Sequence, residues 1–204
     1  MALEQLRRIY REHAASYDRT LWLADRLLLD RLRRAWLARA SGEVLEVALG
    51  TGKSLPFYPP GCRVIGLDLS GEMLALAQNR AGQMGREVPC TIGDAARLPF
   101  PGQRFDTVVS TLAGCTFPDP VAAFAEMRRV LRPGGRVLLI EHVRPHHPLF
   151  GALIDAAAPL CIQAMGCTPN RDTPASVRQA GLAITDRAEV LDGLLICLEA
   201  RPES

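Results

Sequence analysis

The sequence predicts an α/β protein with a mostly parallel sheet and helices on both faces. Three observations support this fold class. Amphipathic helical spacing fills the first forty residues, short β-rich runs then alternate with helix-compatible stretches, and the last two β-rich runs are close enough to form an antiparallel hairpin. At 204 residues the chain fits one domain, residues 1–204, with a helical cap over 1–40 and an α/β core over 41–204.

The expected elements follow in chain order. Apolar residues recur at helical spacing from residue 3 to about residue 40, which predicts one or two amphipathic helices. A helix over 120–131 is stopped by Arg132-Pro133-Gly134-Gly135, and a helix over 174–179 ends at Gly181. Residues 145–174 are expected to be less regular. The expected strands cover 43–49, 63–69, 89–92, 105–110, 136–140, 182–190 and 194–200.

Composition limits the function classes. The 24 Lys and Arg against 22 Asp and Glu leave a formal charge of +2, which argues against a nucleic-acid partner. No segment has the pattern of a signal peptide, and no uninterrupted apolar run approaches the roughly 18 to 20 residues that cross a bilayer, so we expect no transmembrane segment and a cytoplasmic protein. Arginines crowd the first forty residues, where they form either a solvated helix face or a peripheral contact with an anionic surface. Oligomeric state is left open.

Six cysteines are scattered along the chain, without a C-x-x-C pair or a His at ligand spacing. We therefore expect no metal site, and we expect Cys115 and Cys167 to be buried small side chains. The cysteines are Cys62, Cys90, Cys115, Cys161, Cys167 and Cys197.

The segment GTGKS after the first expected strand resembles the end of a phosphate-binding loop. A triphosphatase loop needs a glycine where Val47 stands, and a dinucleotide-binding G-x-G-x-x-G needs one where Leu55 stands. Both geometries are disfavoured, which leaves Lys53-Ser54 as an exposed helix start.

Three acidic residues follow three successive expected strands. Glu46 suits a ligand ammonium group, Asp68 suits the two hydroxyls of a ribose, and Asp94 with the backbone of Ala95 suits an adenine edge. Each acid alone could instead cap a helix or a turn. Together they lie at the sheet edge where open α/β sheets bind ligands, and adenosine joined to an amino acid describes S-adenosylmethionine (SAM).

Four motifs occur in the order found in class I SAM-dependent methyltransferases of the methyltransferase type 11, ubiquinone-biosynthesis-like group, and the chain resembles that family. The motifs are Val44–Gly52, Gly66–Leu74, Gly93–Phe100 and Glu126–Gly135. The resemblance implies a Rossmann-like seven-stranded sheet with a reversed last strand and an N-terminal helical lid. Ala48 and Leu49 depart from the family pattern, which usually has small residues there, and make the loop bulkier.

Closer similarity is to the alkyl-thiol methyltransferase-like family and its bacterial relatives, with quinone-biosynthesis and phospholipid N-methyltransferases further away. It is carried by Phe57–Val64, by Val109–Leu112 with Cys115, by Glu141-His142-Val143, and by Gly166-Cys167 followed by Arg171-Asp172-Thr173. We expect an Arg171–Asp172 ion pair to order the last of these loops.

The sequence and the resemblance together predict the site residues. His142, just beyond the fifth strand, is the candidate catalytic residue; its alternative is a ring that satisfies a backbone group. Met73 serves either the adenine face or the core. The expected SAM-binding residues are Tyr17, Glu46, Ala48, Gly50, Thr51, Gly52, Asp68, Leu69, Met73, Asp94, Ala95, Thr111 and Leu112.

The expected function is methyl transfer from SAM to a small-molecule acceptor of thiol, amine or phospholipid, or quinol type, with S-adenosylhomocysteine as product. One alternative is a non-catalytic SAM- or adenosine-binding regulatory domain. A weaker alternative is an NAD-dependent oxidoreductase, for which the sequence offers no hydride-transfer constellation.

Overall fold

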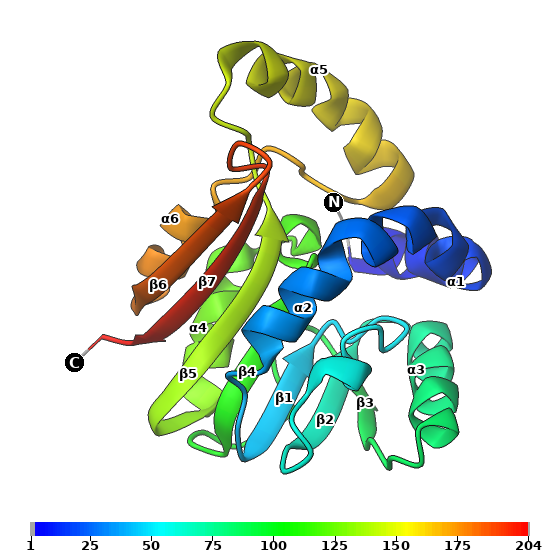
Figure 1. Ribbon diagram of the computed structural model, residues 1–204, viewed down its shortest axis with the longest axis vertical. Helices are drawn as coiled ribbons and strands as arrows, with labels where there is room; N and C mark the ends of the chain where they lie inside the picture. The colour runs from blue at the N-terminus through cyan, green and yellow to red at the C-terminus, as the bar shows by residue number, and fades with distance from the viewer. Residues whose placement is uncertain (1–2, 204) are drawn as a thin grey trace.

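A seven-stranded sheet with the order β3-β2-β1-β4-β5-β7-β6 forms the centre of the computed structural model (Figure 1). The structure describes residues 3–203, without the side chains of 15–17, 20, 21 and 24. All strand pairs are parallel except those of β7, which runs antiparallel to both β5 and β6. The mostly parallel sheet with a reversed last strand is thus confirmed. The strands are β1 (Glu43–Val47), β2 (Arg63–Asp68), β3 (Cys90–Ile92), β4 (Phe105–Thr111), β5 (Leu131–His142), β6 (Leu182–Val190) and β7 (Leu195–Pro202).

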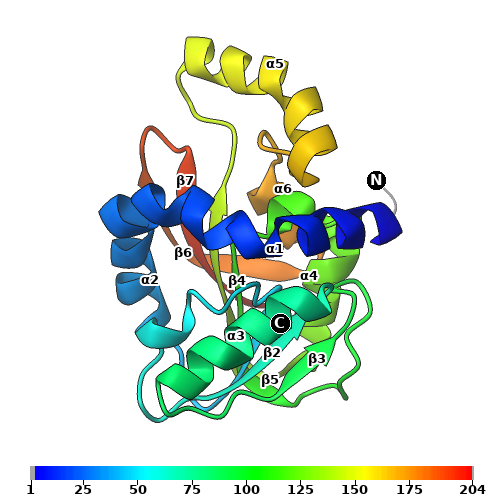
Figure 2. The same cartoon turned by 90° about the vertical axis from the view of Figure 1, so that its right-hand side faces the viewer.

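Helices cover both faces of the sheet, as expected. Helices α2 and α3 pack on one face and α4 and α6 on the other, while α1 lies across the upper end of the sheet beside α3 (Figures 1 and 2). The α-helices are α1 (Leu3–Ala24), α2 (Asp30–Leu37), α3 (Gly71–Gln83), α4 (Pro120–Val130), α5 (Pro148–Met165) and α6 (Thr173–Gln179), with a π-helical segment η1 (Asp25–Leu29) and 3₁₀ turns η2 (Leu55–Phe57) and η3 (Gly114–Thr116).

Local capping fixes where the core helices begin. The Ser70 hydroxyl accepts from the Met73 N–H at 3.3 Å, and the Asp119 carboxylate accepts from the Ala122 N–H at 2.9 Å with Pro120 in the first turn. These contacts satisfy N–H groups that a helix start leaves unpaired. Because Ser70 caps α3, the Asp68 side chain is left for other contacts.

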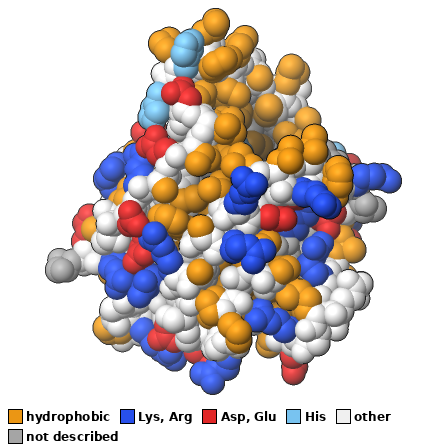
Figure 3. Space-filling view, viewed as in Figure 1, with side chains coloured by type: hydrophobic (Ala, Val, Ile, Leu, Met, Phe, Trp, Pro, Cys, Tyr) orange, Lys and Arg blue, Asp and Glu red, His pale blue; other side chains and the backbone are white. Residues whose placement is uncertain are grey.

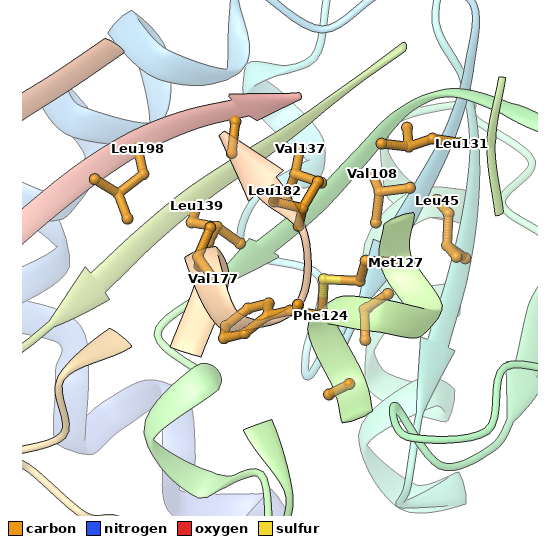
Figure 4. Close-up of a cluster of buried hydrophobic side chains, with 14 of the residues drawn as sticks. Leu45, Val108, Phe124, Met127, Leu131, Val137, Leu139, Val177, Leu182 and Leu198 are labelled. Atoms are coloured by element: carbon orange, nitrogen blue, oxygen red, sulfur yellow. The ribbon is translucent and has the colours of Figure 1, made fainter. Parts of the chain in front are cut away.

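The core has two halves, one on each face, because alternate residues of each strand point to opposite sides. On the face covered by α4, Leu45, Val108 and Leu139 pack against Phe124 and Met127 (Figure 4). On the other face the neighbouring strand residues pack against α2 and α3. Both faces of the sheet are therefore dry, as expected for central parallel strands.

Two expectations about short segments were wrong in detail, and a third, about residues 145–174, is described below. The segment after β1 forms only the short turn η2, because Pro56, Pro59 and Pro60 interrupt a longer helix. Residues 132–135 lie within the bounds of β5, where Gly134 at φ +79° turns the strand after α4 ends.

Residues 145–174, expected to be irregular, contain the 18-residue helix α5, which projects from the upper end of the sheet (Figures 1 and 2). By length and composition α5 is apolar enough to cross a membrane, although Asp155 interrupts its apolar run. Its apolar residues surround the helix without helical periodicity, and Pro159 lies inside it, so the sequence pattern concealed it.

We predict that replacing Phe124 by Ala lowers the free energy of unfolding by about 3–5 kcal/mol, since the ring is fully buried and its removal leaves a cavity. Phe150→Ala, at a ring that is 56% exposed on α5, should change it by less than about 0.5 kcal/mol. Urea unfolding followed by circular dichroism measures both, and equal losses would contradict the assigned core.

Candidate functional site

A cavity opens at the carboxyl ends of β1, β2 and β4. The loops that follow these strands form its walls, and Leu3, Leu6 and Tyr10 of α1 form its roof. This is the edge at which open α/β sheets bind ligands. Of the predicted site residues, Ala48, Gly50, Asp68, Leu69, Met73, Asp94, Ala95, Thr111 and Leu112 line this cavity.

The loop after β1 takes a left-handed backbone at alternate residues. Ala48, Gly50 and Gly52 have φ of 59°, 59° and 76°. A Cβ on Gly50 would point into open space, whereas one on Gly52 would come within 3.1 Å of the Ala77 backbone in α3. Gly52 thus lets the loop approach α3, and Gly50 leaves its backbone open to the cavity. Ala48 holds a conformation that costs a non-glycine residue roughly 1–2 kcal/mol.

Asp68 joins two loops at the floor of the cavity. One carboxylate oxygen accepts from the Gly50 N–H at 2.8 Å and the other from the Ser70 N–H at 2.9 Å. Burial raises the pKa of this carboxyl group above its ordinary value, although the backbone hydrogen bonds act in the opposite direction. Each oxygen keeps a second lone pair for a ligand hydroxyl.

Asp94 and Ala95 form the far wall of the cavity. The Asp94 carboxylate accepts from the Ala96 N–H at 2.9 Å, which shapes the turn after β3. Met73 is 1% exposed and also lines the cavity, so it serves both the core and the site.

Glu46 lies beneath the loop rather than on the wall of the cavity. Its side chain is fully buried, and the Tyr58 hydroxyl donates to Oε2 at 2.9 Å. Among the described residues, Oε1 has no hydrogen-bond partner. Burial raises the pKa of Glu46 to about 7, and the neighbouring Ser54 and Tyr58 hydroxyls offset part of that effect. An unpaired buried carboxylate oxygen is a site for a cationic group.

A second, smaller cavity lies on the other side of Gly50 and shares Ala48, Gly50, Thr111 and Leu112 with the first. Thr51, predicted to bind ligand, lines this second cavity. Arg33 and Lys53 bring positive charge to its wall. A ligand that fills both cavities would therefore pass over Gly50.

The prediction that Lys53-Ser54 is an exposed helix start was wrong. Ser54 is 2% exposed, and the Lys53 ammonium pairs with Asp25 in η1. Arg33, at 4% exposed, donates to Asp25 at 2.7 Å and to Asp30 at 3.1 Å. A buried cation must be paired, so Arg33 does not belong to a solvated or membrane-facing arginine surface. The sequence does not reveal these ion pairs, because Asp25 is distant from Lys53 in the chain.

Asp18 ties α1 to the loop after β1. Its carboxylate accepts from the Thr51 hydroxyl at 2.6 Å and from the Arg80 guanidinium. The Arg80 Nε also donates to the Thr51 carbonyl at 2.9 Å. The N-terminal helix thus covers the site, as the lid prediction requires, while the side chain of Tyr17 lies outside the described residues.

His142 lies at the end of β5 with Cys115 and Cys167, and it lines neither cavity. Its Nε2 is 3.3 Å from the Cys167 Sγ, and its Nδ1 is 3.4 Å from the Pro169 carbonyl. The Sγ atoms of Cys115 and Cys167 lie 3.5 Å apart and share a hydrogen bond. The sequence separates these residues widely, and only the fold brings them together.

Charge in this cluster favours the Cys167 thiolate. The hydrogen bond shared with Cys115, together with the nearby His142 and Arg171, holds the pKa of Cys167 below its ordinary value despite burial. Burial lowers the pKa of His142, but its contact with Cys167 outweighs that effect and the pKa is raised.

The expected Arg171–Asp172 ion pair was wrong. Arg171 donates to the Phe117 carbonyl at 2.8 Å, and Asp172 caps α6 by accepting from the Ala175 N–H at 2.9 Å. A carboxylate that caps a helix satisfies backbone N–H groups, so the arginine takes carbonyl partners instead.

The chain matches a family model described as "Methyltransferase domain" over residues 45–139. Demethylmenaquinone methyltransferase from Thermus thermophilus is 35% identical over 154 residues, which are 70% of this chain and 68% of that protein. Phosphatidylethanolamine N-methyltransferase from Cereibacter sphaeroides is 44% identical over 103 residues, which are 50% of this chain; the chain spans about half of that relative, 51%.

Among solved structures, a SAM-dependent methyltransferase from Thermotoga maritima has the same fold, with a TM-score of 0.75 at 18% identity. The match covers 95% of this chain and 98% of that chain.

We predict that Glu46→Gln changes how stability depends on pH in the ligand-free protein. The pKa of Glu46 is raised to about 7 in the folded protein from its ordinary value of 4.5, so the folded state holds this proton more tightly. Its contribution to stability is fully present below pH 4.5 and is lost as pH rises through 7, by roughly 3 kcal/mol at most.

In Glu46→Gln the fall in unfolding free energy between pH 5 and pH 8 should be smaller by that amount, as measured by urea unfolding at several pH values. Glu87→Gln, at an exposed loop position, should behave as the wild type. Parallel curves for the wild type and Glu46→Gln would contradict the assignment.

Proposed function

The chain belongs to the class I SAM-dependent methyltransferases, and on this premise we propose that it transfers a methyl group from SAM to a small-molecule acceptor. The observation that carries the proposal is the first cavity, where Gly50, Asp68 and Asp94 from three successive strand ends face one space. This arrangement matches a ligand with a ribose between an adenine and a flexible chain.

The two cavities suit the two ends of SAM. In the first, Asp68 would accept from the ribose hydroxyls, and Asp94 with the Ala95 N–H would bind the adenine edge beside Met73. The open space over Gly50 lets a ligand chain pass close to the backbone.

In the second cavity Arg33 and Lys53, which share the Asp25 carboxylate, would offer their remaining N–H donors to the carboxylate of the methionine end. The free oxygen of Glu46 below it would attract the ammonium group. The residues present therefore fit the cofactor at both ends.

SAM supplies a methyl group already activated by the positive sulfonium. The protein's task is to hold the acceptor in line with that methyl group and to exclude water, which can contribute about 7–11 kcal/mol. The roof of Leu3, Leu6 and Tyr10, fastened by Asp18, provides the exclusion. Of the three acceptor types, amines and quinols are supported by the names of the two relatives, and thiols by the alkyl-thiol resemblance.

Peripheral contact with an anionic phospholipid surface is part of the proposal, as is a cytoplasmic location. Helix α5 exposes Leu153 and Leu160 at 57% and 70%. Figure 3 shows hydrophobic side chains gathered at the upper end of the molecule, over α5, with Lys and Arg side chains below them. In α1 and η1 the exposed Trp22 lies within four residues of the exposed Arg19 and Arg26, a pairing of apolar and basic groups that suits an anionic bilayer.

We predict that the protein binds SAM and S-adenosylhomocysteine but not NAD in calorimetric titration. Asp68→Ala should weaken SAM binding about 10- to 100-fold, since hydrogen bonds to a charged group are worth about 1.5–3 kcal/mol, and Glu87→Gln should not. Labelled SAM offered with a panel of thiols, amines and quinols should label at least one acceptor. Binding of NAD without SAM would contradict the proposal, and saturable SAM binding with no labelled acceptor would favour the regulatory alternative.

We predict that the protein sediments with vesicles containing phosphatidylglycerol but not with pure phosphatidylcholine. The double variant Leu153→Asp/Leu160→Asp should reduce the bound fraction at least about 10-fold, because burying each leucine is worth about 1.5–3 kcal/mol. Leu76→Asp, at an exposed leucine of α3, is the matched control. Equal vesicle binding by the double variant and the wild type would contradict the proposal. A wild-type dimer in light scattering that the double variant dissociates would also contradict it, because the leucines of α5 would then contact a second copy of the chain.

A further inference from the structure

Three soft or nitrogen donors converge beneath the wall of the first cavity. Cys115, His142 and Cys167 each offer one ligand atom, and these atoms all lie within 4.8 Å of one another. Cys115 and Cys167 are 1% and 7% exposed, so the two sulfur atoms are shielded from bulk water, while His142 is half-buried. It plays no part in the cofactor contacts described above.

Three different segments supply the donors, and hydrogen bonds join these segments. Cys115 comes from η3 after β4, His142 from the end of β5, and Cys167 from the loop after α5. The Thr168 N–H donates to the Cys115 carbonyl at 2.9 Å, which links the two cysteine loops directly.

Two further contacts hold the cluster in place. Arg171 donates to the Phe117 carbonyl and so binds the loop after α5 to the end of η3. Glu141 accepts from the Gly114 N–H at 2.9 Å and fixes the start of the same turn. The positions of the donors are therefore set before any ligand arrives.

The separations of the donors suit one tetrahedral metal ion. With Zn–S near 2.3 Å and Zn–N near 2.0–2.1 Å, two thiolates on one zinc lie about 3.7–3.8 Å apart, and a thiolate and an imidazole about 3.5 Å. The observed separations are 3.5 Å between the sulfur atoms and 3.3 Å between the Cys167 Sγ and the His142 Nε2. The third pair, the Cys115 Sγ and the His142 ring nitrogen, lies within 4.8 Å, and the ion would draw these two atoms together.

The outer contact of the histidine also fits metal binding. With the proton on Nδ1, His142 donates to the Pro169 carbonyl and keeps the lone pair of Nε2 for the cluster. Metal-binding histidines are commonly oriented in this way. Two thiolates would neutralise the charge of a divalent ion, which lowers the free-energy cost of burying it.

We propose that Cys115, His142 and Cys167 bind one Zn²⁺ ion and leave its fourth position open for a thiolate acceptor. Three protein ligands with one open position are typical of catalytic zinc, whereas structural zinc has four. The η3 turn that carries Cys115 also supplies Thr116 to the cavity wall, so the ion lies beside the proposed methyl-transfer site. The acceptor part of this inference rests on the proposed function; the metal site does not.

The methyl-transfer step balances as follows. A thiol releases its proton to water as its sulfur binds the ion as a thiolate. A sulfur lone pair then forms a bond to the methyl carbon, the bond from that carbon to the sulfonium breaks, and its electron pair stays on the sulfur of S-adenosylhomocysteine. The product thioether is neutral, binds the ion weakly and leaves.

Metal analysis of the purified full chain tests the site. We expect about one zinc per chain in the wild type, and less than about a tenth in Cys115→Ser, Cys167→Ser and His142→Gln, since each removes one of three ligands. Cys62→Ser, at a half-buried cysteine outside the cluster, should keep the ion. Circular dichroism and SAM affinity show whether each variant is folded.

Cobalt gives a second readout of the same site. The Co²⁺-substituted protein should show sulfur-to-cobalt charge-transfer absorption that is lost in the two cluster cysteine variants. No zinc or cobalt bound to the wild type, equal amounts bound to folded cluster variants, or a Cys115–Cys167 disulfide found by thiol counting would overturn the metal site.

A thiol titration tests the open position. An alkanethiol should shift the charge-transfer absorption of the Co²⁺ protein, and removal of zinc by a chelator should lower methyl transfer to that thiol at least about 100-fold with SAM affinity unchanged. Methyl transfer that persists without zinc would overturn the inference and leave the proposed function standing. Zinc bound with no acceptor methylated would support the metal site and refute the proposed function.

Discussion

The carboxylate of Asp68 is the interaction on which the site depends. It accepts from Gly50 in the loop after β1 and from Ser70 at the start of α3, so one side chain sets the spacing between two adjacent strand ends. Without it the Gly50 N–H would lose its partner, and the left-handed turn that opens the loop would have less support. The two cavities meet at Gly50, so the hydrogen bond between the Gly50 N–H and Asp68 fixes the backbone that separates them.

Two buried glutamates support the two halves of the site in a similar way. Burial raises the pKa values of Glu46, in β1, and Glu141, in β5, to about 7. Each has one oxygen bound by a turn or a tyrosine and one oxygen without a partner among the described residues. One lies beneath the second cavity and the other beside the Cys115 turn. Unsatisfied buried groups of this kind reduce stability and occur where a protein is prepared for a ligand.

The sequence predicted the sheet, its reversed strand and most of the residues that line the cavity, because strand alternation and glycine turns are local signals. It did not predict the pairing of Lys53 with Asp25 or the cluster of Cys115, His142 and Cys167, because both depend on how segments distant in the chain come together in the fold. One signal was available: Cys115 follows β4 and His142 ends β5, and the family fold makes those two strands adjacent. Helix α5 was missed because its apolar residues lack the one-sided pattern of a core helix.

The position of β7 in the sheet has a consequence for the order in which the chain assembles. This strand is the last along the chain, yet it lies between β5 and β6, and its Leu198 carbonyl accepts from the Trp36 indole at 3.0 Å. During synthesis β5 would therefore carry an unpaired edge, and α2 an unpaired indole, until β7 has left the ribosome. Open strand edges are sites of intermolecular pairing, so the nascent chain passes through a stage at which chaperones would recognise it.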